Sequence, residues 1–400
     1  MADITDTAMV RRASVNDAAR SRTRAEAGSA ALAPLDSIAA DRWQDLSDRA
    51  LEPNGYYLPD WELAVNASAP GRTGAAALFA WDPASPARLT GLLPVVWLRR
   101  AFKIPLPALV SAHPYGTLCT PLLDRDSAER AFAGMMQAAR QAGAHALILR
   151  EVALEGAAMA ALTKVCERRG LRPRVLASHR RASLDATRDA DALLRDALGS
   201  KKLKELRRQW HRLDELAALS FEVARSREEV AAAIETFLKL EASGWKGRRG
   251  TALIQVPGDA GFIRHATAAL AARGQCDIVT LRSGETPVAA GVVLRHQDRA
   301  FFFKIGVDER FAKFSPGVQL TLELTRHLCA DPNIASADST ASPDHPMINP
   351  IWRGRLAIGD VLIPLRRNDP LVALVHAALL WRQTILAVAR RGVRRWRGRR

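Results

Sequence analysis

Two segments of this chain share one pattern, and that repetition restricts the possible folds more than any other feature. Each has an apolar run, a turn built from residues such as Pro, Gly and Ser, a second apolar run and a helical pattern. The runs lie at 75–81 and 89–98 before a helix at 127–142, and at 277–281 and 288–294 before a helix at 317–328. Apolar runs around turn residues predict β-hairpins. We therefore predict an α/β fold that contains an internal duplication of a mixed unit.

Chance similarity between two unrelated α/β domains is the alternative to this duplication. The chain is long enough for either, since 400 residues, 48% of them hydrophobic, correspond to about two domains of ordinary size. Four cysteines lie far apart without the spacing of a zinc site or a disulfide framework. This pattern and a polar N-terminus favour a cytoplasmic protein.

The chain is strongly basic, with 58 Lys and Arg against 42 Asp and Glu and a net charge of +16. Such an excess favours anionic partners, among them nucleic acid, anionic lipid and phosphorylated cofactors. Part of the excess is confined to one tail, because residues 390–400 hold seven Arg and no acid. At the other end, residues 1–35 have few large apolar side chains and are predicted to form a disordered lead.

A basic amphipathic helix is predicted between the two halves, within a linking segment at 196–218. Leu203, Leu206, Trp210 and Leu213 recur at helical spacing, and six Lys or Arg occupy much of the stretch from Ser200 onward. The helix either grips an anionic substrate or simply packs one face on a domain and leaves the other in water.

The C-terminal segment, 369–400, is predicted to be an apolar and then Arg-rich helix. Residues 371–381 are apolar except for His376, but Arg382 and Gln383 interrupt the run before it is long enough to span a bilayer. An interfacial helix on an anionic membrane surface, peripheral at its inner face, fits this pattern. A helix that packs on a domain and ends in a basic tail fits it too.

The stretch from Phe301 to Leu320 reads as an aromatic strand, a loop and the start of a helix. Ser315, Pro316, Gly317 and Val318 form that start. A helix N-terminus presents backbone N–H groups and the positive end of the macrodipole, so it can hold a phosphorylated ligand. We therefore predict the cofactor-binding entrance at these residues.

The second half resembles the GNAT acyltransferases and, more specifically, the CelD-like acetyltransferases associated with cellulose biosynthesis. The order of hairpin, strand and helix start agrees with the GNAT fold, and the resemblance covers about residues 195–365. It is carried by four motifs, at Phe237–Ala252, Lys304–Asp308, Phe314–Gly317 and Asp344–Trp352. The glycine-rich pyrophosphate loop of ordinary GNAT enzymes is absent, and only Gly317 lies near its expected place.

The resemblance implies tandem GNAT-like domains, at 36–195 and 219–368, each with a mixed central sheet flanked by helices. It also implies acetyl-CoA or another acyl-CoA as the donor. The acceptor would be a small molecule or a glycan, in exopolysaccharide or envelope metabolism. Nothing in the sequence predicts a metal site or a nucleophile elbow, so the acceptor amine or hydroxyl is expected to attack the thioester directly.

Three residues at strand ends or in loops are candidates for the catalytic base: Asp308, Asp338 and His345. Each also has a structural explanation, because Asp caps turns and a His before Pro shapes a loop.

Four further residues are candidates for substrate binding: Trp245, Lys246, Lys304 and Trp352. The two tryptophans could equally pack in a core, and Lys304 could mark a sheet edge.

Two other functions remain open. Fem-type enzymes look similar in their duplicated fold and use aminoacyl-tRNA, whose phosphates the basic helix at Lys201–Arg212 would suit. A scaffold without activity could use its Arg-rich tail to bind membrane or nucleic acid. If the protein is an acyl-CoA-dependent enzyme, nucleic acid is not an expected partner.

Overall fold

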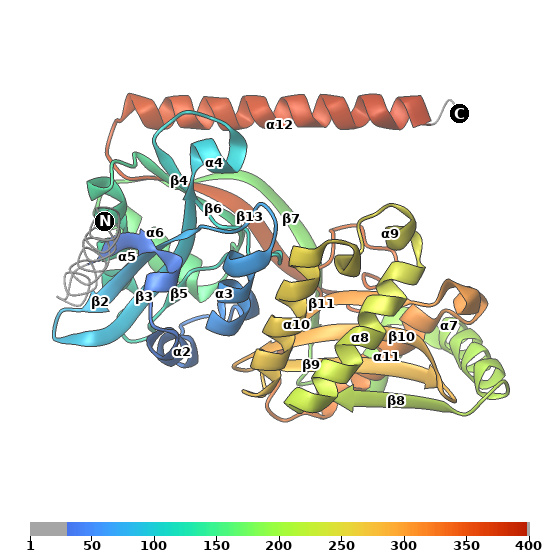
Figure 1. The fold of residues 1–400 in the computed structure, drawn as a ribbon. Coiled ribbons are helices and arrows are strands. Elements are labelled where there is room, and N and C mark those ends of the chain that lie inside the picture. Colours follow the sequence, from blue (N-terminus) through green and yellow to red (C-terminus); the bar gives the residue numbers. More distant parts are fainter. Residues whose placement is uncertain (1–29, 398–400) are drawn as a thin grey trace, which may run out of the picture.

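The computed structural model describes residues 30–397, and its two halves share one sheet (Figure 1). The N-terminal half contains β1 (Ala31–Pro34), η1 (Leu35–Ser37), α2 (Ala40–Asp48), η2 (Gly55–Tyr57), α3 (Pro59–Ser68), β2 (Ala76–Asp82), β3 (Ser85–Trp97), α4 (Leu98–Phe102), β4 (Ala108–Ser111), β5 (Leu122–Leu123), α5 (Ala128–Gln141), β6 (Ala146–Ala153), α6 (Ala157–Arg168) and β7 (Arg174–Asp185). The C-terminal half contains α7 (Ala190–Asp214), β8 (Leu219–Ala224), α8 (Arg227–Ser243), α9 (Trp245–Arg248), η3 (Leu253–Gln255), α10 (Pro257–Ala271), β9 (Cys276–Ser283), β10 (Thr286–His296), β11 (Arg299–Val307), η4 (Glu309–Phe314), α11 (Pro316–Ala330), β12 (Ser336–Asp338), β13 (Gly354–Pro364) and α12 (Pro370–Arg397).

The strand order reveals the duplication. It runs β1-β2-β3-β4-β6-β13-β7-β12-β11-β10-β9-β8, with the short β5 beside β3. The order β1-β2-β3-β4-β6 in the first half corresponds to β8-β9-β10-β11-β12 in the second. In each half the last pair is parallel, and a helix, α5 or α11, makes the crossover that parallel neighbours require. The predicted mixed α/β duplication is confirmed, and so are both hairpins, β2–β3 and β9–β10.

One strand crosses from the second half into the first. β13 lies within the segment predicted as the second unit, 219–368, yet it pairs antiparallel with β6 on one side and with β7 on the other. In turn β7 pairs with β12 of the second half. Most residues of β13 are buried, and an apolar run of this kind does not specify which strands lie beside it. The halves are therefore joined by strand pairing as well as by side chains.

The predicted disordered lead needs correction at its end. Residues 1–29 lie outside the described part of the chain, whereas Ala31–Pro34 form β1, which pairs antiparallel with β2 and places Leu32 opposite Leu78. An edge strand obtains its order from the backbone bonds of its neighbour, so it does not need the large apolar side chains that the prediction looked for.

Helix α7 confirms the predicted basic amphipathic helix. Leu203, Leu206 and Leu213 are buried, whereas Lys201 and Arg208 are exposed. The helix begins earlier than predicted, at Ala190, and bends at Gly199, where φ is 72°. Only glycine adopts that left-handed conformation at little cost.

A buried histidine links the two halves beside the sheet. His296, at the end of β10, accepts a hydrogen bond at Nδ1 from the Asn54 backbone N–H (2.8 Å) and donates from Nε2 to the Ser47 carbonyl (2.9 Å). Burial lowers the pKa of His296, although both backbone bonds work in the opposite direction. The ring is therefore neutral in the folded protein.

We expect this histidine to make the fold sensitive to acid. The unfolded ring takes up a proton near pH 6.5 while the folded ring resists it, so the unfolded chain binds more protons and stability falls as the pH drops below about 6.5. Urea unfolding of the wild type and of His296→Gln, which keeps one donor and one acceptor, should separate this contribution from that of other histidines. The variant should lose less stability between about pH 7 and pH 5; equal losses would contradict the assignment.

Candidate functional site

The halves meet at an aromatic wall. Tyr56 and Trp61 from the first half pack against Phe262 of α10 and Phe303 of β11 in the second. The ring centroids of Trp61 lie 5.0 Å from Phe262 and 4.9 Å from Phe303. Tyr115, in the loop between β4 and β5, adds a fifth ring 4.9 Å from Phe262. These rings build a rigid surface at which the chain can present polar groups.

Polar side chains gather at the edge of this wall, and we name them the junction cluster: Arg72, Tyr115, Glu241, Lys246, Asp259 and Lys304. Tyr115 donates its hydroxyl to Asp259 Oδ2 (2.6 Å), and the Arg72 guanidinium carbon lies 4.2 Å from the centre of the Tyr115 ring. Lys304 Nζ lies 5.7 Å from the same ring. Glu241 Oε1 binds Lys246 Nζ at 2.8 Å and Lys304 Nζ at 3.5 Å.

Two atoms in the cluster have unused hydrogen-bonding capacity. Asp259 Oδ1 and Arg72 Nε are buried and have no partner among the described residues. Buried polar atoms are nearly always paired, so an unpaired one requires an explanation, such as a ligand or water. Tyr115 also has a φ of 59°, a conformation that non-glycine residues rarely adopt and that concentrates at functional sites. Together these features indicate a polar ligand.

The surroundings shift the pKa values of Glu241, Lys304 and Tyr115. Burial alone would raise the pKa of Glu241, but the charges of Lys304 and Lys246 outweigh it and hold that pKa below its usual value. Burial lowers the pKa of Lys304, and the attraction of Glu241 opposes this only in part. Burial and the bond to Asp259 both raise the pKa of Tyr115. Glu241 is therefore ionised and the Tyr115 hydroxyl stays protonated.

Strands β11 and β12 separate beside the junction cluster. Their parallel register ends at Phe301 opposite Asp338, whereas β11 continues to Val307. Just past that point β11 bulges, because Val293 faces Phe302 and Val292 faces Lys304, which leaves Phe303 without a partner in the register with β10. A bulge exposes backbone groups and is common next to active sites.

The start of α11 is partly occupied by its own hydrogen bonds. Pro316 has no N–H, and the amides of Val318 and Gln319 both donate to the Ser315 carbonyl (2.9 and 3.0 Å). The Gly317 amide makes no bond to Ser315, but Gly317 itself is buried. A side chain on Gly317 would meet Met347 and Val307 at 3.1 Å, so substitution there would disturb packing as well as any binding.

The structure brings several predicted residues together. Lys246 and Lys304 share Glu241, and the Trp245 amide donates to Glu309 Oε1 (2.9 Å), at the start of the η4 turn that leads to α11. Trp245 itself is half exposed, with the Arg249 guanidinium 5.0 Å from its ring centre. Thus α9, η4 and the start of α11 form one basic mouth.

Two of the predicted catalytic bases already form hydrogen bonds with neighbouring residues of the protein. Asp308 caps η4 and pairs with Arg310 (2.7 Å), whose hydrogen bonds hold the pKa of Asp308 below its usual value despite its burial. His345 lies in the loop before β13, accepts from the Ile348 amide (3.4 Å) and has a pKa lowered by burial. Neither belongs to the junction cluster.

Asp338 and Trp352 lie in the core. Asp338 makes a bidentate ion pair with Arg181 of β7, and both side chains are only 1% exposed. Trp352 is buried, donates its indole N–H to Thr325 Oγ1 (2.9 Å) and packs on Phe302. We therefore correct both assignments: Asp338 joins the halves, and Trp352 fills the space beneath α11.

Sequence reasoning missed Arg72, Tyr115, Glu241 and Asp259. Glu241 lies inside the motif Phe237–Ala252, so a search of that motif for charged residues would have found it. Tyr115 stands in a Pro-Tyr-Gly sequence typical of a turn. Nothing local distinguishes Arg72 or Asp259, because the fold brings them together from distant segments.

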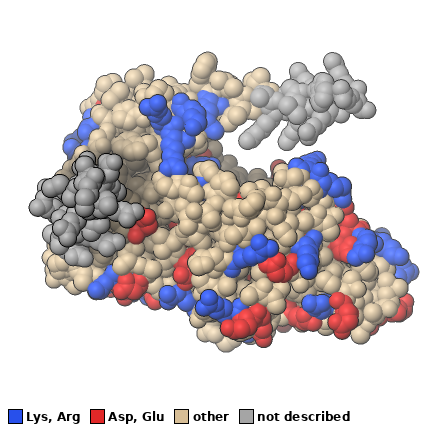
Figure 2. Space-filling model, in the orientation of Figure 1, with Lys and Arg blue, Asp and Glu red and all other residues tan. Residues whose placement is uncertain are grey.

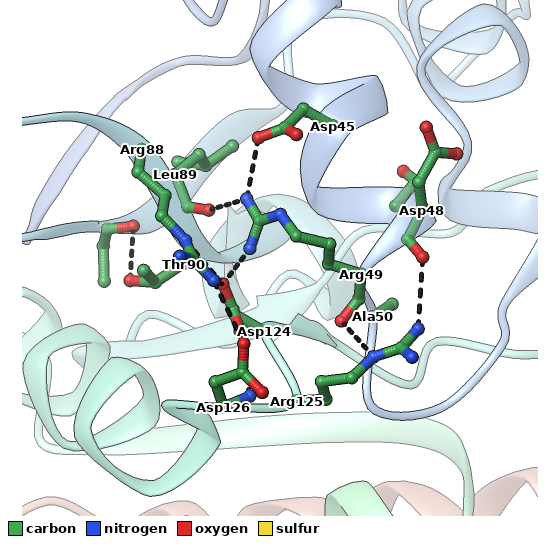
Figure 3. Close-up of polar contacts among 12 residues, drawn as sticks. Asp45, Asp48, Arg49, Ala50, Arg88, Leu89, Thr90, Asp124, Arg125 and Asp126 are labelled. Carbon is green, nitrogen blue, oxygen red and sulfur yellow. Dashed lines mark hydrogen bonds and ion pairs between the residues drawn. The ribbon is translucent and has the colours of Figure 1, made fainter. Parts of the chain in front are cut away.

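A second polar cluster, in the N-terminal half, is structural (Figure 3). Arg49 at the end of α2 and Arg88 of β3 both point at the fully buried Asp124, with Arg88 Nη2 at 2.8 Å from Oδ2. Its other oxygen accepts from the Asp126 amide (2.9 Å). A groove of about 770 Å³ lies nearby between α5 and α6, but its Glu129 is paired with Arg168 and Lys164. Asp124 therefore braces the fold and is not available as a base.

No group of three or more His, Cys, Asp or Glu side chains is placed to hold a metal ion in residues 30–397.

The duplicated parallel pairs and the diverging strands define the class of fold, a tandem mixed α/β fold. Residues 200–344 match the family model described as the acetyltransferase (GNAT) domain, so this part of the chain is a GNAT-type acyltransferase domain. No curated protein sequence matches the chain significantly.

Solved structures share the fold over most of this chain. FemX has a TM-score of 0.56 at 11% identity, over 85% of this chain and 98% of its own. The C-terminal domain (DUF2156) of a protein assigned as a lysylphosphatidylglycerol synthetase from Agrobacterium fabrum has a TM-score of 0.52 at 14% identity, over 85% of this chain and 95% of its own. Identities this low show a shared fold.

Proposed function

We propose that this protein is an acyl-CoA-dependent N- or O-acyltransferase, most simply an acetyltransferase, that works by direct attack on the thioester. The observation that carries the proposal is the divergence of two strands, because the register of β11 with β12 ends at Phe301 opposite Asp338 while β11 continues past its bulge to Val307. We place the reaction at this divergence, between the start of α11 and the junction cluster. A donor could enter from one side and an acceptor from the other.

The donor would bind at the basic mouth. The Gly317 amide, the positive end of α11 and the side chains of Arg248 and Lys313 are suited to phosphate groups. Phe303, which has no opposite residue in the register with β10, could direct its N–H at the thioester oxygen as that atom becomes an oxyanion.

The acceptor would bind at the junction cluster. Its amine or hydroxyl attacks the carbonyl carbon, the bond between that carbon and sulfur breaks, and the thiolate of CoA takes up a proton. The acceptor's own proton needs a base, and Asp259 Oδ1 is a buried oxygen without a partner among the described residues. We assign that role to Asp259. The resemblance to CelD-like enzymes supports a glycan or a small molecule of exopolysaccharide or envelope metabolism as the acceptor.

An aminoacyl-tRNA donor is the second candidate. The likeness to FemX over 85% of the chain supports it, since Fem-type enzymes use that donor. The exposed basic side of α7, with Lys201, Lys204 and Arg208, offers cations for phosphates.

Calorimetry with acetyl-CoA, longer acyl-CoAs and free CoA tests the main proposal, together with a matched pair of variants. Ser315 caps α11 with φ at 54°, a conformation and a position that both Asp and Asn tolerate. Ser315→Asp should therefore preserve folding but weaken acyl-CoA binding about tenfold or more, because its charge repels phosphate at close range. Ser315→Asn should bind like the wild type.

The result also separates the two donors. If Ser315→Asp and Ser315→Asn bound acyl-CoA equally well, the phosphates of the donor would not bind near the start of α11. If no CoA species binds and the purified protein retains tRNA in a strongly salt-dependent way, the aminoacyl-tRNA reading replaces the main proposal.

A further inference from the structure

Helix α12 has two apolar sides, and the protein covers only one of them. Val372, Val375 and Leu379 pack on Val110 and Ile148 of β4 and β6. These three residues recur at helical spacing and account for the attachment of the first turns to the N-terminal half. The C-terminal part of the helix extends past this half as a single rod (Figure 1).

The opposite side of the helix is apolar and exposed. Leu374, Trp381, Ile385 and Val388 recur at spacings of seven, four and three, so they share one face. Their exposed fractions are 55%, 71%, 49% and 62%. We call these four residues the outer face of α12. It runs for about 21 Å at 1.5 Å per residue. Exposed apolar surface of this extent marks an interaction site.

The charged residues on α12 and on α4 beneath it are basic. Between residues 371 and 389 the sequence has one Lys or Arg and no acid. That residue, Arg382, lies on the Phe102 ring of α4, with its guanidinium carbon 4.2 Å from the ring centre. The chain then continues into seven Arg within residues 390–400. Lys and Arg side chains also gather over α4, beneath α12 (Figure 2); α4 and its flank contribute Arg99, Arg100 and Lys103.

We propose that α12 docks this protein on an anionic lipid bilayer, with its outer face in the headgroup and acyl boundary. A long helix with an apolar face, a Trp and many Arg is typical of interfacial binding. Basic residues next to the apolar face are attracted to anionic headgroups. None of the helices in the described part of the chain is both long and apolar enough to cross a membrane, so the proposed attachment is to the surface.

Charge favours the bilayer over a second copy of the chain. A parallel pair of α12 helices would bring two clusters of seven Arg together and would lack acids to neutralise them. An anionic surface neutralises the same charges while it accepts the apolar residues. This inference concerns attachment and holds whichever donor the transferase uses.

Flotation of the full-length protein with vesicles tests the proposal. The vesicles contain phosphatidylcholine either alone or with about 30% phosphatidylglycerol, at low and high salt. The wild type should float with the anionic vesicles, and less so at high salt. The double variant Trp381→Ser, Ile385→Ser should bind them at least tenfold more weakly. A control double variant, Val175→Ser with Leu216→Ser, removes apolar side chains that are 57% and 61% exposed elsewhere and should bind like the wild type.

Three results would overturn the proposal. The wild type could fail to float with anionic vesicles. The Trp381 and Ile385 variant could bind as well as the wild type, in which case the Arg-rich end alone acts, on lipid or nucleic acid. Light scattering could show a wild-type dimer that this variant converts to a monomer, in which case a second copy covers the outer face.

Discussion

Replacing Asp338 with alanine is expected to lower the free energy of unfolding by about 3–5 kcal/mol, the typical effect of removing one partner of a buried ion pair. The reason is the environment of Arg181. Its guanidinium is as buried as Asp338, and its remaining bonds go to the carbonyl and hydroxyl of Thr117 (2.6 and 2.9 Å). Without the carboxylate a positive charge stays in the core between β7 and β12. Urea unfolding measures the loss.

The neighbouring residue on β7 supplies the control. Arg180 pairs with Glu155 at 3.3 Å, with side chains 64% and 66% exposed. Glu155→Ala should therefore cost less than about 1 kcal/mol. The double variant Arg181→Met, Asp338→Leu should be more stable than Asp338→Ala, because it leaves no buried charge unpaired. If Asp338→Ala cost no more than Glu155→Ala, the buried pair would stabilise the fold no more than an exposed one.

The local elements of this fold could be predicted from the sequence, because each depends on neighbours along the chain. Apolar runs around turn residues located β2–β3 and β9–β10, and the spacing of Leu203, Leu206 and Leu213 located α7. The insertion of β13 between β6 and β7 could not be predicted, since strand residues specify a buried face and not a partner. The short β1 was missed because backbone hydrogen bonds to β2 hold it in place, and its own sequence has few large apolar side chains.

The site was predicted in part for the same reason. Lys246 and Lys304 were found because they occur in motifs, but the fold brings them together through Glu241, 63 residues before Lys304. Asp338 looked like a catalytic residue at a strand end. The sequence could not show that Arg181, 157 residues away, occupies both of its oxygens. The α11 start was expected to have several available amides, whereas the left-handed Ser315 turns its carbonyl to two of them.

Replacing Asp259 with asparagine should reduce kcat by about 100-fold or more, the usual range for losing a general base. Asparagine keeps the size of the side chain and an oxygen for the Tyr115 hydroxyl, so the junction cluster should stay assembled. The KM for acyl-CoA should be unchanged, because the donor binds at the mouth formed by α9, η4 and α11. Release of the CoA thiol, followed with an amine or hydroxyl acceptor, measures the rate.

A change of nucleophile distinguishes proton removal from mere positioning. Hydroxylamine is largely unprotonated near neutral pH and attacks thioesters with little help from a base. Asp259→Asn should therefore lose much less rate with hydroxylamine than with an ordinary acceptor. Asp60→Asn is the matched control, since Asp60 of α3 also reaches the second half, through Arg273 (2.7 Å), but lies outside the cluster; it should retain nearly full activity. Equal losses for Asp259→Asn with both nucleophiles would show that Asp259 only orients Tyr115. The base would then have to be sought elsewhere along the divergence of β11 and β12.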